Sequence, residues 1–394
     1  MDPVTHGLSG AVLARAVIPS NSDERITRTA RWTLFLGSIF PDIDVIANPF
    51  DPDHFATIRF HRSVTHSLVC LPVWAFLFAL LAARFCRRRG IAAPRRSVLG
   101  VLFGTGIALH ILFDCITSFG TMVWSPISWT RVQWDWTFIV DLALTGVLMF
   151  FLLLSWIAER AERQKLRAVW MLSLMSVLVG AYATGSYAME KPMPAWAAAA
   201  VLVLAALPVM IAFLGGRLPL AARGWCWVAV LATAAYLGMN AWAHANALER
   251  VRNYSATAKV QMSQIAAIPL PPNLTEWQGL VRTPESVYGW KISLADPPGT
   301  PIAAAVVPAM SGEACPQTLW AIPQVRVWMR FARFPVVVCG HKAGNETAEF
   351  TDLRFERPAL RSDVKPGRER PIPFTWRITF TDGGRVLTAG WVIR

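Results

Sequence analysis

Charged residues are scarce in this sequence: only 16% of its 394 residues are Asp, Glu, Lys or Arg, whereas 54% are hydrophobic. A soluble globular chain averages about 25% charged residues, so this chain has too little polar surface to cover itself in water. Its apolar residues gather in runs of about 20, the length that an α-helix needs to cross a bilayer. The composition therefore excludes an ordinary soluble protein and predicts an integral membrane protein.

Acidic residues are especially few, with 25 Asp and Glu against 38 Lys and Arg, which gives a formal net charge of +13. In a soluble protein such an excess would suggest nucleic-acid binding. Here the arginines lie largely in short loops between apolar runs, and that pattern is typical of membrane topology. We therefore expect no nucleic-acid partner.

Cysteine is also sparse, and none of the six cysteines falls in a C-x-x-C or other metal-ligand spacing. Four lie in or near apolar runs, where cysteine usually packs as a small hydrophobic residue. Cys315 and Cys339 lie in the polar C-terminal part and could pair outside the reducing cytoplasm, but the sequence leaves this open. No cleavable signal peptide is evident, since Met1-Asp2-Pro3 opens with an acid.

The apolar segments predict a set of membrane helices. The first two, 4–18 and 32–40, are short for a full crossing, so we expect a half-inserted hairpin. The arginine-rich loops around 84–96, 160–167 and 217–223 share one parity, which indicates the cytoplasmic side. The opposite face, and everything after the last run, is then expected outside the cytoplasm. Full crossings are expected at 64–83, 97–118, 137–158, 167–188, 195–215 and 225–246.

From about residue 247 the pattern changes to proline clusters, Gly-containing turns and roughly alternating apolar residues, as in 325–331. Such segments predict short β-strands. The expected fold is mainly α, a polytopic transmembrane helical bundle followed by a soluble, mostly β domain. We expect a membrane core with two short N-terminal helices over 1–145, additional transmembrane helices over 146–249 and an extracytoplasmic β-rich domain over 250–394.

Seven His and Asp side chains stand out in the apolar half of the chain. Ionisable groups in or beside hydrocarbon cost several kcal/mol, so they indicate a functional site. The expected topology brings all seven to the outer face, and their N and O atoms suit zinc or another first-row divalent ion. Because seven donors exceed one tetrahedral site, we predict two or more ions, zinc or alternatively manganese. The seven are His6, Asp42, Asp44, His61, His66, His110 and Asp114.

Each piece of this set has a structural alternative. His110 and Asp114 are four apart and share a helix face, but such a pair could simply hydrogen-bond between helices. His61 is expected just ahead of a helix, with Ser63 as N-cap and His66 in the first turn, although either His could be an interfacial cap. The turn that holds Asp42 and Asp44 could be merely solvated.

Further residues near the set have weaker patterns. Asp135 and Asp141 could support the site or add a ligand, and the tryptophans around them could form an interfacial belt or a groove for substrate. A lone histidine is usually structural, and we expect this of His54, His244 and His341.

The motifs resemble the YdjM-type family of membrane-bound metal-dependent hydrolases over roughly the first 145 residues, although the family usually has Gly where Ser63 stands. A looser likeness extends to Trp277 and Asp352-Leu353-Arg354-Phe355. The resemblance implies hydrolysis distantly like that of zinc phospholipase C and related nucleases. The matching pieces are Asp2-Pro3-Val4-Thr5-His6, residues 37–44, residues 61–67 and residues 110–126.

These expectations combine into a phosphoester hydrolase that acts on a lipid or lipid-linked head group at the outer face of the cytoplasmic membrane. Asp44 is the expected general base if it is not a ligand, with Arg62 and His61 as further catalytic candidates. An amidase or esterase is the nearest alternative. A non-enzymatic alternative is a metal-stabilised scaffold or transporter subunit that presents the C-terminal domain.

Overall fold

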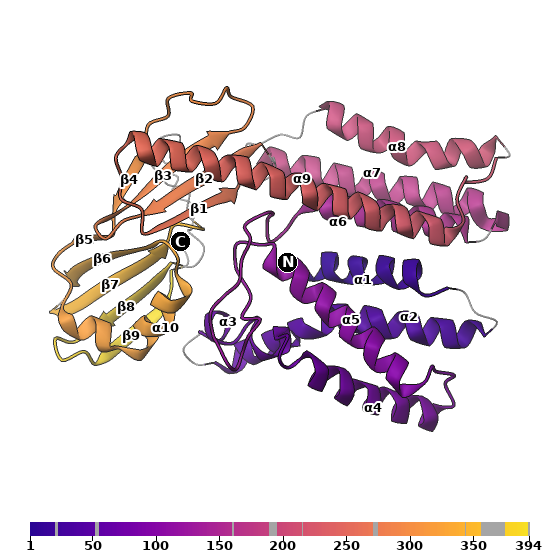
Figure 1. Ribbon diagram of the computed structural model, residues 1–394, viewed down its shortest axis with the longest axis horizontal. Helices are drawn as coiled ribbons and strands as arrows, with labels where there is room; N and C mark the ends of the chain where they lie inside the picture. The colour runs from indigo at the N-terminus through magenta and orange to yellow at the C-terminus, as the bar shows by residue number, and fades with distance from the viewer. Residues whose placement is uncertain are drawn as a thin grey trace.

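The computed structural model has a helical part, up to Thr257, followed by a β-rich part (Figure 1). It describes residues 1–19, 23–51, 55–159, 161–188, 195–214, 216–270, 275–342, 344–355 and 375–392. The α-helices of the first part are α1 (Pro3–Val17), α2 (Glu24–Ile39), α3 (Ala56–Arg59), α4 (Leu71–Arg89), α5 (Arg96–Cys115), α6 (Leu142–Ala158), α7 (Gln164–Ala188), α8 (Ala195–Phe213) and α9 (Ala222–Thr257). Short 3₁₀ segments are η1 (Phe40–Phe50), η2 (Val64–His66) and η3 (Ala161–Arg163).

Two of the described helices, α5 and α9, are long and apolar enough to cross a membrane by themselves. A third span results if the Ala56–His66 segment and α4, which meet at a bend of 72°, are counted together. The six long apolar runs all overlap helices, but α6 has only 17 residues because Asp141 caps its start by accepting hydrogen bonds from Ala143 N and Leu144 N. Beyond these two or three spans, the polytopic bundle stays a prediction.

Aspartate caps also fix the starts of the two N-terminal helices. Asp2 accepts a hydrogen bond from Thr5 N at 3.0 Å and Pro3 opens α1, where its missing N–H costs nothing. Asp23 caps α2 by accepting from Arg25 N at 2.8 Å. The caps define where each helix begins and therefore which residues lie at its ends.

Glycine lets α2 and α5 approach at backbone distance. A Cβ at Gly37 would collide with the Phe103 carbonyl, and one at Gly106 would collide with the Leu34 carbonyl. Only glycine avoids these collisions. The contact brings the C-terminal end of α2 directly beside the middle of α5, where His110 Nδ1 donates to Ser38 O at 2.7 Å.

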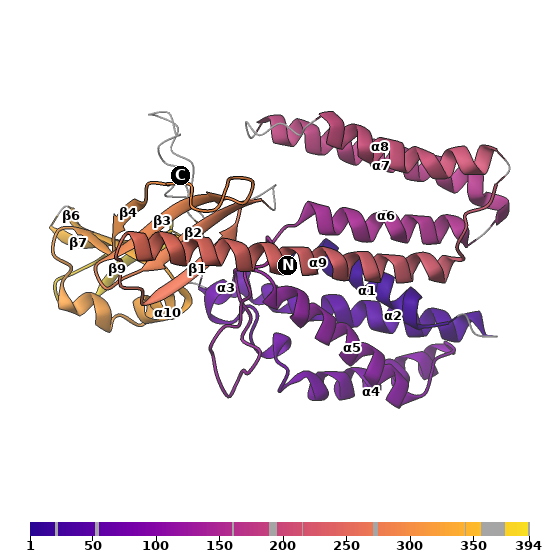
Figure 2. The same ribbon diagram turned by 45° about the horizontal axis from the view of Figure 1, so that its top comes forward.

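The β-rich part contains two sheets. The first is antiparallel in the order β1-β2-β3-β4, and the second runs β5-β6-β7-β8-β9 with β5 parallel to β6 and the other pairs antiparallel. The long helix α9 extends from the helical part to the first sheet, as both views show (Figures 1 and 2). The strands are β1 (Gln264–Pro269), β2 (Glu276–Arg282), β3 (Ser286–Ser293), β4 (Ala305–Pro308), β5 (Met310–Gly312), β6 (Pro335–Lys342), β7 (Asn345–Asp352), β8 (Trp376–Phe380) and β9 (Val386–Trp391).

One segment expected as a strand is a helix. Residues 325–331 form most of α10 (Pro323–Phe331), which follows η4 (Gln317–Ala321). The burial period decides the outcome, because Val325, Trp328 and Phe331 are buried at every third position, whereas a strand would bury every second one. The boundary expected at residue 250 falls inside α9, seven residues before that helix ends at Thr257 and well before the first strand.

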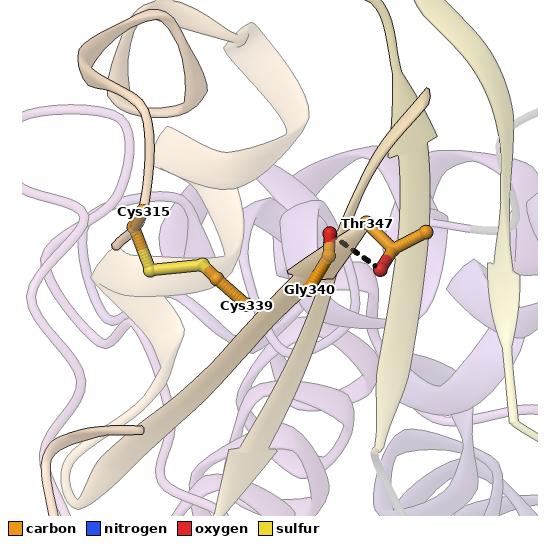
Figure 3. Close-up of a disulfide and its surroundings, with 4 residues drawn as sticks. All are labelled: Cys315, Cys339, Gly340 and Thr347. Atoms are coloured by element: carbon orange, nitrogen blue, oxygen red, sulfur yellow. Dashed lines mark hydrogen bonds between the residues drawn. A yellow bond between two sulfur atoms is a disulfide. The ribbon is translucent and has the colours of Figure 1, made fainter. Parts of the chain in front are cut away.

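A disulfide joins Cys315 to Cys339 of β6, with the two Cα atoms 5.4 Å apart (Figure 3). Next to it, Thr347 of β7 donates its hydroxyl to the Gly340 carbonyl at 2.9 Å. The pairing that the sequence left open is therefore present. Cys70, Cys86, Cys115 and Cys226 are free.

The helical and β-rich parts share a hydrophobic core. Phe55, Ile58 and Phe119 from the helical part belong to the same buried cluster as Trp328 and Phe331 of the second part. The edge-to-face contact of Phe55 with Trp376 of β8, at 4.9 Å between ring centroids, continues this core. The second sheet and α10 therefore pack directly against the loops that surround the predicted site.

Candidate metal centre

Six of the seven predicted ligands converge in two sets. Each residue of a set offers one donor atom within 4.8 Å of the others, and Asp42 belongs to both sets. The residues come from η1, from the 61–66 segment and from α5. The inner set is Asp42, His66, His110 and Asp114, and the outer set is Asp42, Asp44 and His61.

The inner set is buried and tightly arranged. The Nε2 atoms of His66 and His110 are 3.1 Å apart and lie 3.3 and 3.4 Å from Asp114 Oδ2. Both Nε2 atoms are also 3.5 Å from Asp42 Oδ1. Burial alone would raise the pKa of Asp42, but hydrogen bonding to His110 and His66 outweighs burial and holds this pKa well below its usual value.

The hydrogen bonds around the inner set point its lone pairs at one another. Because the Ser38 carbonyl can only accept, His110 Nδ1 carries the hydrogen and Nε2 of the neutral ring offers a lone pair. Asp114 Oδ2, although buried, has no hydrogen-bond partner among the described residues. Two imidazole nitrogens and two carboxylate oxygens that face each other suit a divalent cation, so the residues present fit the metal expected from the sequence.

Asp44 organises the outer set. Its Oδ1 lies 2.8 Å from His61 Nδ1, and its Oδ2 accepts from Arg62 N at 3.1 Å and from Thr65 Oγ1 at 3.0 Å. Burial would raise the pKa of Asp44, but hydrogen bonds from His61 and His66 outweigh it and place this pKa well below its usual value. Asp44 is therefore an ionised carboxylate whose two oxygens hold the 61–66 segment in place.

His6 lies beside the two sets rather than in them. Its ring stacks on that of His110 with 3.5 Å between centroids, and its Nε2 is 3.2 Å from Asp114 Oδ1. Asp114 Oδ1 also contacts the Met1 amine and lies 3.0 Å from Arg62 Nη2. The Met1 amine, Arg62 and His6 thus gather on Oδ1, while Oδ2 faces His66 and His110 of the inner set.

Two expectations for the 61–66 segment are wrong. Ser63 caps no helix but donates its hydroxyl to the Phe60 carbonyl, and His66 lies in the short η2 rather than in the first turn of α4. The same segment places the Arg62 side chain inside the protein. Arg62 has a positive φ of 63°, and its Nη1 donates to Thr117 Oγ1 at 3.1 Å. The left-handed turn directs the guanidinium inward, to Asp114.

The remaining acidic and imidazole candidates lie elsewhere. Asp141 caps α6 and accepts from Tyr236 OH at 2.8 Å, and Asp135 pairs with Arg333 of the β-rich part at 2.8 Å. His244 packs near Trp277, at 5.8 Å between ring centroids, and His341 pairs with Glu346 on the neighbouring strand, whereas His54 lies outside the described residues.

Arg131 is a functional candidate that the sequence did not reveal. It is partly buried and donates to the carbonyls of Gly120, Ile58 and His61 at 2.9 to 3.2 Å. These hydrogen bonds connect the 58–61 segment to the loop that contains Gly120. One signal could have indicated it: an arginine on the expected outer side runs against the positive-inside pattern.

Residues 1–187 match the model of a protein family described as YdjM inner membrane protein. This part of the chain is a YdjM-family region. The match confirms the resemblance and extends it from about residue 145 into α7. It includes every residue of both donor sets, so the candidate metal centre lies wholly within the YdjM region. No curated protein and no solved structure matches the chain.

Proposed function

We propose that this protein is a membrane-embedded metal-dependent hydrolase that cleaves a phosphoester in a lipid or lipid-linked head group at the outer face of the cytoplasmic membrane. The observation that carries the proposal is the inner set, in which buried imidazole and carboxylate lone pairs face one another without a proton donor for Asp114 Oδ2 among the described residues. A buried polar group without a partner is costly, so the arrangement favours a bound cation.

The inner set would hold one ion, and Asp42, Asp44 and His61 would hold a second. When bound, such ions stabilise developing charge on a phosphoryl oxygen and lower the pKa of a water so that it becomes a nucleophile near neutral pH. Should the outer set carry no ion, His61 takes over proton transfer, because Asp44 orients its Nδ1 and leaves the base role to the other ring nitrogen.

Exposed apolar residues at the edge of the site support a lipid substrate. The outer set retains some access to solvent, with 15% of the His61 side chain and 12% of the Asp44 side chain exposed. Beside it, Ile43 is 50% exposed and Phe60 49%. Such a border suits a substrate whose head group reaches the carboxylates while its acyl chains stay in the bilayer.

The outer-face location rests on two further features. The turns that carry many arginines, between α4 and α5, α6 and α7, and α8 and α9, lie at the end of the helical part opposite the β-rich part (Figure 1). Arginine-rich turns favour the cytoplasmic side. The Cys315–Cys339 disulfide favours an oxidising compartment for the other end.

The test is metal content, by ICP-MS, of full-length protein purified in detergent after incubation with Zn²⁺ or Mn²⁺ and desalting. We expect about two equivalents in the wild type and a loss of at least one in the isosteric Asp114→Asn variant. The control is His341→Ala, which removes a histidine from the exposed β6–β7 hairpin and should leave the content unchanged. A wild type that takes up neither metal would refute the proposal. Metal binding without hydrolysis of any phosphorylated lipid would favour the non-enzymatic, metal-stabilised scaffold.

A further inference from the structure

An alternating stack of arginine and phenylalanine side chains leads from the inner set into the β-rich part. Successive members lie 4.8 to 5.3 Å apart, measured from guanidinium carbon to ring centroid. At these distances each cation contacts the face of an aromatic ring. This Arg–Phe stack consists of Arg62, Phe119, Arg131, Phe331, Arg354 and Phe355.

The stack crosses the junction between the two parts at Arg131. The guanidinium of Arg131 contacts two rings. The ring of Phe119, from the helical part, lies 5.0 Å away, and the ring of Phe331, from α10, lies 5.3 Å away. The same guanidinium donates to the carbonyl of His61 at 3.2 Å. The position of the His61 backbone is therefore linked through Arg131 to α10.

Arg354 anchors the far end of the stack. Its Nε donates to Asp352 Oδ2 at 2.8 Å and its Nη2 to the Phe331 carbonyl at 2.8 Å, so the β-rich part fixes its orientation. Its Nη1 reaches across the junction to the Ser118 carbonyl at 2.9 Å. Ser118 directly precedes Phe119, whose ring lies 4.9 Å from the Arg62 guanidinium and 5.8 Å from the His61 ring.

We propose that Arg354 and Phe331 are positioning residues for the metal centre: through the Arg–Phe stack they hold the 58–62 and 117–120 segments where His61 and Arg62 must lie. The inference rests on the proposed function. It also assigns a role to the part of the chain beyond the YdjM region, since Arg62, Phe119 and Arg131 lie within residues 1–187 and Phe331 and Arg354 lie outside them. The site is then complete only when the β-rich part is docked.

The test uses Co²⁺ as a spectroscopic probe of the full-length protein in detergent. Titration with Co²⁺ gives both an apparent affinity and a visible absorption spectrum that depends on ligand geometry. For Arg354→Met we expect binding about tenfold weaker and an altered spectrum, because loss of groups that orient metal ligands typically costs 10- to 100-fold in affinity. Arg354→Lys should not restore either property, since one ammonium cannot replace a planar guanidinium whose three nitrogens donate to separate acceptors. The matched control is Arg377→Met, which breaks a more exposed pair with Glu349 between β8 and β7 of the second sheet.

Phe331→Leu is the second variant, because it keeps an apolar side chain in the core but removes the ring that faces Arg131. If Arg354→Met does not elute as a folded monodisperse species, Phe331→Leu alone tests the positioning role. A wild type that binds no Co²⁺ overturns the metal centre itself. Wild-type Co²⁺ binding with the same affinity and spectrum in the folded Arg354 and Phe331 variants leaves the metal centre intact but overturns the positioning role.

Discussion

Replacement of Gly37 by alanine tests whether the close contact of α2 with α5 maintains the metal centre. The added Cβ would collide with the backbone carbonyl of Phe103, which cannot rotate away as a flexible side chain would. Overpacking of this kind costs about 1–3 kcal/mol, and a backbone collision belongs at the upper end. The better helix propensity of alanine returns about 1 kcal/mol. We therefore expect a net loss of about 2 kcal/mol.

The control is Gly146→Ala in α6, where a new Cβ meets no heavy atom within 4 Å among the described residues. It should stabilise the helix by about 1 kcal/mol, so the two substitutions should shift stability in opposite directions. Melting can be followed with a thiol-reactive fluorophore, because Cys86, Cys115 and Cys226 are buried and free. A loss of about 2 kcal/mol corresponds to a Tm decrease of roughly 4–8 °C.

The same substitution should weaken metal binding. Ser38 follows Gly37, and its carbonyl fixes the ring of His110 through the hydrogen bond to Nδ1. Moving α2 away from α5 would release that ring, and loss of such a partner typically weakens metal affinity 10- to 100-fold. Equal Tm values and equal metal affinities for the Gly37 and Gly146 variants would show that neither the collision nor the Ser38–His110 contact has the importance assigned to it.

Two further predictions concern the metal and the disulfide. Removal of metal with EDTA should lower the Tm of the wild type, because an ion present at 100 times its Kd stabilises the folded state by about 2.7 kcal/mol. Adding Zn²⁺ back should restore the Tm. An unchanged Tm after EDTA would contradict a metal bound at the inner set. Cys315→Ser should destabilise the β-rich part by about 3 kcal/mol, since the disulfide closes a loop across a sequence separation of 24. Faster trypsin cleavage after residue 260, with the helical part intact, is the expected readout, and identical digestion would contradict it.

The sequence indicated which His and Asp side chains gather, because each of these motifs lies at or near a helix end, where the expected topology determines its depth. Charge counting placed Asp42, His66 and Asp114 at one level, and the structure brings them together. It could not predict which residues face one another at that level. His6 lies close to the two sets, but the packing of α1 turns its ring onto His110 instead of into a donor set.

The incorrect local predictions share a physical cause, since tertiary contacts override short patterns. Ser63 has the residue type of an N-cap, but the chain turns through a positive φ at Arg62 and the serine bonds backward to Phe60. Residues 325–331 alternate like a strand, but packing against β6–β8 selects the helical burial period. The junction that holds Arg131 between Phe119 and Phe331 joins segments about 200 residues apart, and no local pattern reveals such a pairing.

Charge balance favours a divalent metal at the inner set over neutral imidazoles without an ion. A proton between the Nε2 atoms of His66 and His110 would satisfy these two nitrogens but would compensate only one negative charge. Three carboxylates meet within the two sets, Asp42, Asp44 and Asp114, and the Arg62 guanidinium beside them supplies one compensating charge. With neutral imidazoles, negative charge remains whether or not the Met1 amine is protonated, whereas a shared proton together with a protonated Met1 amine would balance the three carboxylates. A divalent ion at the inner set neutralises the excess that neutral imidazoles leave and occupies the position to which Asp114 Oδ2 is directed. Because the ion competes with protons for the imidazole nitrogens, metal uptake should strengthen as the pH rises.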